Sequence, residues 1–130
     1  NMHMIFTGNP GTGKTTIARI LAKYLKAIGA LRGGQLVEVT RADLVGRYVG
    51  HTAPLTNSVI QSALGGVLFI DEAYALYRGG EDSFGLEAID TLVKGIEDHR
   101  DDLVVILAGY TKEMQLPKSA HCVKLPQASL

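Results

Sequence analysis

The sequence has few of the features that stabilise small secreted domains or build membrane proteins. Its 130 residues include no tryptophan and only one cysteine, Cys122. Because a disulfide needs two cysteines, an internal disulfide is excluded. The longest unbroken apolar run, residues 103–108, is far shorter than the roughly 20 residues of a membrane-spanning helix. The four histidines show no metal-ligand spacing with the cysteine, which argues against structural zinc. We therefore expect a globular protein of the cytoplasm or an organelle matrix, with no membrane partner.

Net charge is also lacking, because 13 basic side chains balance 13 acidic ones. The two signs are nevertheless segregated along the chain. Residues 1–50 hold seven basic and two acidic side chains, whereas residues 71–102 hold three and ten. Such polarity favours an anionic ligand at the basic end or head-to-tail association, although solvated faces also segregate charge by chance. No basic stripe with interleaved aromatic residues is present, which disfavours sequence-specific nucleic-acid binding.

Short apolar strands alternate with helical patterns through most of the chain. Strands are predicted at residues 4–7, 35–40, 67–70 and 103–108, and helical segments up to residue 28 and at 41–45, 52–64 and 86–98. The last two strands are apolar throughout, as expected of parallel strands covered on both faces. Right-handed crossovers then predict an α/β fold in which helices cover both sides of a parallel sheet.

Finer features of the helices follow from residue spacing. In the first helix the predicted buried face consists of Ile17, Ile20, Leu21, Tyr24, Leu25 and Ile28. Gly29 is predicted to end this helix in a left-handed conformation, and Thr52 to cap a later helix. Residues 79–85 are expected to form a glycine-rich acidic loop. The pattern weakens after Lys112, where only 122–125 is strand-like.

A glycine-rich segment after the first strand matches the phosphate-binding pattern G-x-x-x-x-G-K-[ST]. The predicted nucleotide-binding residues are Gly8, Asn9, Pro10, Gly11, Thr12, Gly13, Lys14, Thr15 and Thr16. Inward-pointing amides and the helix N-terminus favour phosphate, and Lys14 is predicted to reach the β- and γ-phosphates. The Thr15 hydroxyl is a predicted Mg²⁺ ligand. A glycine turn without a ligand is the alternative, but it requires neither the Lys-Thr pair nor three glycines.

Two carboxylates follow the third strand. Asp71 is placed to hold Mg²⁺ through water, and Glu72 is a candidate to polarise an attacking water as general base. Successive residues at a strand exit point in different directions, which suits two separate roles. Read alone, the pair is more simply a solvated strand end, but the phosphate loop upstream favours the catalytic interpretation.

The segments GNPGTGKTT, VLFIDEAYAL and LVVILAGYTKEM resemble the AAA+ ATPases. The fuller match, with RADLVGRYVGHTA and DSFGLEAIDTLVKGIED, is similar to the CbbX (red-type rubisco activase) and stage V sporulation protein K branch, over residues 3–114. The resemblance implies a P-loop NTPase three-layer sandwich with strand order 5-1-4-3-2. It also implies ATP and Mg²⁺ as cofactors, a hexameric ring and a client polypeptide pulled through a central pore.

Further roles are implied only by this resemblance. Residues 8–15 would be the Walker A loop, with Asp71 and Glu72 as the Walker B pair. Thr111 falls at the sensor 1 position, where many relatives have Asn. Arg47, Tyr48 and Val49, followed by Gly50, resemble the first pore loop, in which an aromatic ring grips the client.

The sequence then departs from the family pattern. We expect residues 1–114 to form an incomplete nucleotide-binding core, and 115–130 an atypical tail with a candidate fifth strand at 122–125. The helical lid is expected to be absent. The last arginine is Arg100, so residues 101–130 contain no candidate arginine finger and turnover should be weak or absent. A non-catalytic nucleotide-binding or regulatory module and a small-molecule P-loop kinase stay as alternative functions.

Overall fold

The structure is a computed structural model that describes residues 4–7, 13–76, 83–109 and 121–124. Its elements in chain order are β1 (Met4–Thr7), α1 (Lys14–Ala27), β2 (Leu36–Val39), α2 (Arg41–Leu44), α3 (Thr52–Ala63), β3 (Val67–Ile70), the 3-10 helix η1 (Ala73–Leu76), α4 (Ser83–Asp98), β4 (Val104–Ala108) and β5 (His121–Lys124). Within these ranges, no helix has both the length and the apolar character needed to cross a membrane.

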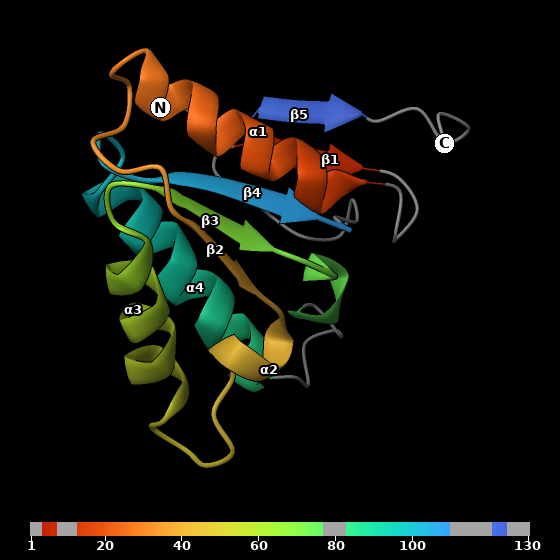
Figure 1. Ribbon diagram of the computed structural model, residues 1–130. Helices are drawn as coiled ribbons and strands as arrows, with labels where there is room; N and C mark the ends of the chain where they lie inside the picture. The colour runs from red at the N-terminus through yellow and green to blue at the C-terminus, as the bar shows by residue number, and fades with distance from the viewer. Residues whose placement is uncertain (1–3, 8–12, 77–82, 110–120, 125–130) are drawn as a thin grey trace.

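The five strands form one parallel sheet in the order β2-β3-β4-β1-β5 (Figure 1). This is the order 5-1-4-3-2 that the family resemblance implied, so the predicted fold class is confirmed. In the register, Ile5 of β1 lies beside Leu107 of β4 on one side and Cys122 of β5 on the other. The first strand is therefore an interior strand with a neighbour on each side, and β5 begins one residue before the predicted segment 122–125.

Helices cover both faces of the sheet, as predicted (Figure 1). The side chains of β3 and β4 alternate between two buried clusters. Leu68 and Leu107 pack with α3 and α4, whereas Phe69 and Ile106 pack beneath α1. Each fully buried side chain of this size contributes about 1.5–3 kcal/mol through removal from water, which explains why both strands are apolar at every position.

The predicted buried face of α1 was right for Leu25, which is buried, and for Leu21, which is partly buried, but wrong at its other four positions. The helix rests on the sheet through Ala18, Ala22 and Leu25, and the small alanines let its backbone approach closely. The larger residues of the predicted face, Ile17, Ile20, Tyr24 and Ile28, are exposed, with Ile20 at 63%. Hydrophobic spacing identified the helix, but the residues that fit against the sheet are chosen by size as well as polarity.

Three local predictions also need correction. Thr52 is not the cap of α3, since His51 holds that position and Thr52 is fully buried in the first turn. The helix expected from residue 86 begins at Ser83, within the segment assigned to a loop. The 3-10 helix η1 was not predicted because its four residues are too few for a periodic pattern. Gly29 does adopt the predicted left-handed conformation, with φ of 80°.

Candidate functional site

All five strands run in the same direction, so their carboxyl ends lie at one edge of the sheet. There the exits of β1, β4 and β3 are neighbours, with β4 in the centre. Helix α1 begins after the exit of β1, while Asp71 and Glu72 follow β3 and Gly109 follows β4. The sheet order thus brings together two segments that lie about 57 residues apart in the sequence, as expected for a ligand site in a parallel α/β sheet.

The start of α1 has the properties of an anion site. Gly13 occupies the N-cap position with φ of 82°, a backbone conformation that is sterically unfavourable for residues other than glycine. Because glycine has no side chain, it makes no side-chain cap. No acidic residue lies in the first turn, where a carboxylate would compete with an anionic ligand. Lys14 is buried, at 4% exposure, whereas Thr15 is half-buried and Thr16 is exposed. Residues 8–12 of the predicted phosphate loop lie outside the described residues.

Asp71 and Glu72 extend from the end of β3 in different ways. The Asp71 N–H continues the sheet ladder by donating to the Val39 carbonyl oxygen at 2.9 Å. One carboxylate oxygen of Asp71 accepts the Glu72 N–H, also at 2.9 Å, which orients this carboxylate at the strand exit. Glu72 is exposed and has φ of 51°, the only positive value among described residues other than glycine. The chain therefore turns sharply at Glu72.

Contacts from two neighbouring elements hold this turn. The Tyr74 N–H donates to the Gly109 carbonyl oxygen at 2.8 Å, and the Ala75 N–H donates to that of Glu72 at 2.9 Å. From the other side, Arg41 Nη1 donates to the Ala75 carbonyl oxygen at 2.8 Å. The segment from Glu72 to Leu76 is thereby connected to the ends of both adjacent strands, β4 and β2.

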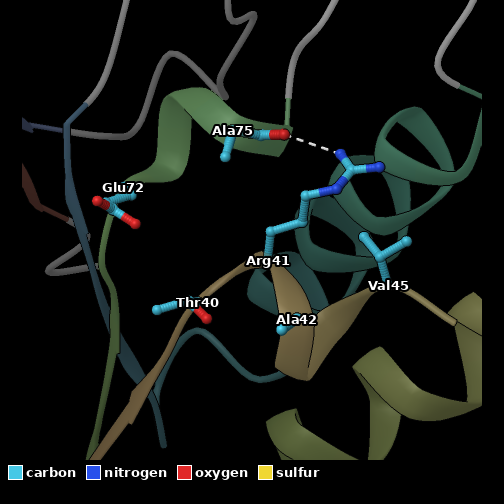
Figure 2. A pocket seen from close by; sticks show the side chains of 6 residues that line it. All are labelled: Thr40, Arg41, Ala42, Val45, Glu72 and Ala75. Carbon is cyan, nitrogen blue, oxygen red and sulfur yellow. Dashed lines mark hydrogen bonds between the residues drawn. The ribbon is translucent and has the colours of Figure 1, made fainter.

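Figure 2 shows the open pocket that Arg41 crosses. Its volume is about 400 Å³, and its lining residues are Thr40, Arg41, Ala42, Val45, Glu72 and Ala75. Residue patterns did not identify Arg41 as a functional candidate. The available signal was positional, since Arg41 follows β2 by the same interval as Glu72 follows β3, and Val39 is paired with Ile70.

The predicted pore-loop residues lie on a separate part of the molecule, between α2 and α3. Tyr48 and Val49 are 67% and 88% exposed, and Arg47 is exposed as well. The Tyr48 ring meets the His51 ring edge to face, with centroids 5.5 Å apart. This loop presents apolar area to solvent, which is costly unless a partner covers it.

Buried threonines fasten both sides of this loop. The Thr52 Oγ1 accepts the Gly46 N–H at 3.0 Å, and the Thr56 hydroxyl donates to the Leu44 carbonyl oxygen at 2.8 Å. Both threonines are completely buried. The loop therefore projects from a rigid base. Thr111, the predicted sensor 1 residue, lies outside the described residues, two positions beyond Gly109.

Residues 4–124 match the AAA family, described as the ATPase family associated with various cellular activities. The match spans nearly the whole chain. The chain belongs to the AAA family. A solved structure of the FIGL-1 AAA domain in complex with ADP has the same fold, with a TM-score of 0.60 over 96% of this chain and 44% of that one, at 22% identity.

Several curated AAA relatives are much closer in sequence. The chain is 58% identical over 113 residues to stage V sporulation protein K of Bacillus subtilis, and 60% identical over 115 residues to protein CbbX of Cereibacter sphaeroides. It is 57% identical over 114 residues to a chloroplastic ribulose bisphosphate carboxylase/oxygenase activase of Cyanidioschyzon merolae. These alignments cover 87–88% of the chain but only 35–39% of the relatives. The resemblance inferred from the motifs is thus confirmed, for about a third of each relative's length.

The described residues of this AAA chain fit a nucleotide with Mg²⁺. Backbone amides at an uncapped helix start and the buried Lys14 suit a polyphosphate. The hydroxyl of Thr15 and the carboxylate of Asp71 are oxygen donors of the kind that Mg²⁺ prefers, and this ion keeps several waters. A Mg²⁺ site of this kind needs no cluster of acidic side chains, because oxygen atoms of the phosphates serve as further ligands of the ion.

Proposed function

We propose that the chain is the Mg-ATP-binding and ATP-hydrolysing core of a ring-forming AAA+ ATPase that remodels client proteins. One observation carries the proposal: the sheet order sets the start of α1, with Lys14, and the exit of β3, with Asp71 and Glu72, on the two sides of β4. Family membership and the similarity to CbbX and rubisco activase support it. We place the protein in the cytoplasm or an organelle matrix.

Each site residue is assigned a physical role. Backbone amides within residues 8–16 would bind the phosphates, and the Lys14 ammonium would neutralise charge on the β- and γ-phosphates. Thr15 would bind Mg²⁺ directly, and Asp71 would hold the ion through water. When bound, the ion stabilises negative charge on the phosphates. Glu72 orients the attacking water and accepts its proton, and Thr111 donates a hydrogen bond to the γ-phosphate or to that water.

Client binding is assigned to the loop that bears Arg47, Tyr48 and Val49. An exposed aromatic ring on a rigid base offers large apolar area at low entropic cost, which suits contact with varied polypeptide segments. In a hexamer these loops would line the central pore. The segregated charge along the chain, basic within residues 1–50 and acidic within 71–102, favours association between copies.

Calorimetry with Mg-ATP and single-turnover hydrolysis test the proposal. Lys14→Ala should weaken binding by about tenfold to a hundredfold, because a charged hydrogen bond contributes about 1.5–3 kcal/mol. Lys23→Ala, an exposed lysine of the same helix, is the control and should bind normally. Glu72→Gln should retain binding and lower hydrolysis by about 10²-fold or more. Normal binding by Lys14→Ala would contradict the proposal, and phosphate transfer unaffected by Glu72→Gln would favour a kinase.

A further inference from the structure

The backbone at Glu72 has to be held by its surroundings. Residues other than glycine pay a steric cost at positive φ, and Glu72 adopts φ of 51° directly after a buried strand. Such conformations persist where neighbouring structure imposes them. The direction of the Glu72 side chain follows from this backbone geometry, so whatever holds the turn also sets where the carboxylate lies.

Arg41 reaches this turn from a rigid position. It is the first residue of α2, and this short helix is anchored by Leu44, which has no exposed surface. The Thr40 N–H donates to the Asp43 carboxylate at 3.0 Å, which fixes the start of α2. From there the Arg41 guanidinium extends to the Ala75 carbonyl oxygen, three residues beyond Glu72 (Figure 2).

We infer that Arg41 is a positioning residue for Glu72, which it holds in the left-handed turn through the Ala75 carbonyl. This inference rests on the proposed function of Glu72 as general base. The Gly109 carbonyl oxygen holds Tyr74 from the β4 side, and Arg41 holds Ala75 from the β2 side. Without the guanidinium, η1 loses its hydrogen bond to the start of α2. The apolar packing of Ala73 and Leu76 does not fix the backbone direction at Glu72, which can then relax towards ordinary φ. Since displacement of a reacting group by about 1 Å can cost 10²-fold in rate, hydrolysis should fall while nucleotide binding is retained.

Single-turnover ATP hydrolysis and Mg-ATP calorimetry on the full chain test this role. Arg41→Ala should slow hydrolysis about tenfold or more, with the dissociation constant for Mg-ATP unchanged within about twofold. Arg41→Lys keeps one donor for the carbonyl and should give an intermediate rate, which also covers the case in which Arg41→Ala fails to fold. Arg100→Ala, an exposed arginine after α4, is the control and should hydrolyse normally.

A double-mutant cycle separates positioning from general destabilisation. If Arg41 acts through Glu72, then Arg41→Ala should not slow the Glu72→Gln variant further. A normal rate for Arg41→Ala, or an equal slowing in both backgrounds, overturns the inference. Failure of the proposed function is distinct, because there Lys14→Ala binds Mg-ATP as tightly as the unmodified chain or Glu72→Gln hydrolyses normally.

Amide exchange tests the same contact without any turnover. Arg41→Ala should accelerate hydrogen exchange at the amides of Tyr74 and Ala75, whose hydrogen bonds hold the turn, while exchange in β3 stays unchanged. Unchanged exchange at both amides overturns the inference, even if the chain does not hydrolyse ATP.

Discussion

The backbone N–H of Tyr74 donates a 2.8 Å hydrogen bond to the carbonyl oxygen of Gly109, and this bond connects the exits of β3 and β4. Gly109 itself has φ of 76°, and a Cβ at that position would lie 3.1 Å from the Tyr74 ring and 3.3 Å from Glu72 Cα. The glycine therefore permits both the backbone conformation and the close approach. It connects the strand that precedes Thr111 with the turn that contains the proposed general base.

Replacement of Gly109 by alanine should affect both stability and hydrolysis. The positive φ costs about 1–2 kcal/mol for a residue with a Cβ, and the new methyl group would push on Tyr74 and Glu72. Gly29→Ala is a matched control, because Gly29 has φ of 80° but nothing within 4 Å of a Cβ. Denaturant unfolding should show a lower free energy of unfolding in both variants, whereas the rate of single-turnover hydrolysis should fall only in Gly109→Ala. Equal hydrolysis in the two variants would contradict this explanation.

Glu87 caps a helix other than its own. Its carboxylate accepts the Ala53 N–H at 2.8 Å, near the start of α3, where His51 makes no side-chain cap. Glu87→Ala should therefore lower the free energy of unfolding by about 0.5–2 kcal/mol, as loss of a helix cap does. Glu87→Gln keeps an acceptor oxygen, so its free energy of unfolding should fall less than that of Glu87→Ala. Asp90→Ala, at an exposed position of α4, serves as the control in urea unfolding. If Asp90→Ala lowered the free energy of unfolding as much as Glu87→Ala, the capping role would be disproved.

Helices α3 and α4 approach closely at Gly95. A Cβ on Gly95 would lie 2.5 Å from Ile60 Cδ1, and Ile60 is buried. Gly95→Ala should destabilise the chain by about 1–3 kcal/mol through overpacking, partly offset by the better helix propensity of alanine. In an Ile60→Val background the clashing methyl is removed, so the same substitution should cost less. Unfolding free energies of the four chains measure this coupling, and strict additivity would show that the contact is unimportant.

The pair Arg32 and Asp102 predicts a pH effect. Arg32 donates two 2.7 Å hydrogen bonds to the Asp102 carboxylate, and these bonds lower the pKa of Asp102 and raise that of Arg32. Because the folded pKa of Asp102 lies below its unfolded value, the stabilisation is complete above about pH 4 and is lost as pH falls through the folded pKa.

Asp102→Asn should therefore be slightly less stable than the unmodified chain at pH 7, since the pair is solvent-exposed. The difference in unfolding midpoint should shrink as the pH is lowered below 4, and it should also shrink in high salt. A difference that is independent of pH would indicate that packing, not charge, accounts for the effect. Asp101→Asn, at the exposed neighbouring position, is the control substitution for the unfolding midpoints measured across this pH range.

The strand positions and the sheet order could be predicted from the sequence. The apolar runs that became β3 and β4 are buried on both faces, so composition alone marks them. The strand order came from the family resemblance, because local patterns carry no information about which strands are neighbours. Lys14 was predicted as a site residue from the spacing of its motif, and Asp71 and Glu72 from their place directly after an apolar strand.

The remaining features depend on tertiary contacts that spacing does not encode. The outward-facing residues of α1 were misassigned because a helix with alanines on one side and larger apolar residues on another has two candidate faces. The conformation of Glu72 and the contact from Arg41 arise where β2 and β3 end side by side, and no periodic pattern marks such a place. The burial of Thr52 likewise depends on the loop that folds back onto it.

The place of β1 between β4 and β5 has a consequence for biosynthesis. Translation makes Met4–Thr7 before the other four strands, but both hydrogen-bonding neighbours of this strand, β4 and β5, are made about a hundred residues later. During that interval the nascent strand has no native partner, and its unpaired backbone resembles an open sheet edge. Completion of the sheet at its carboxyl edge is thus a late event in translation, and β1 is the strand that stays unpaired longest.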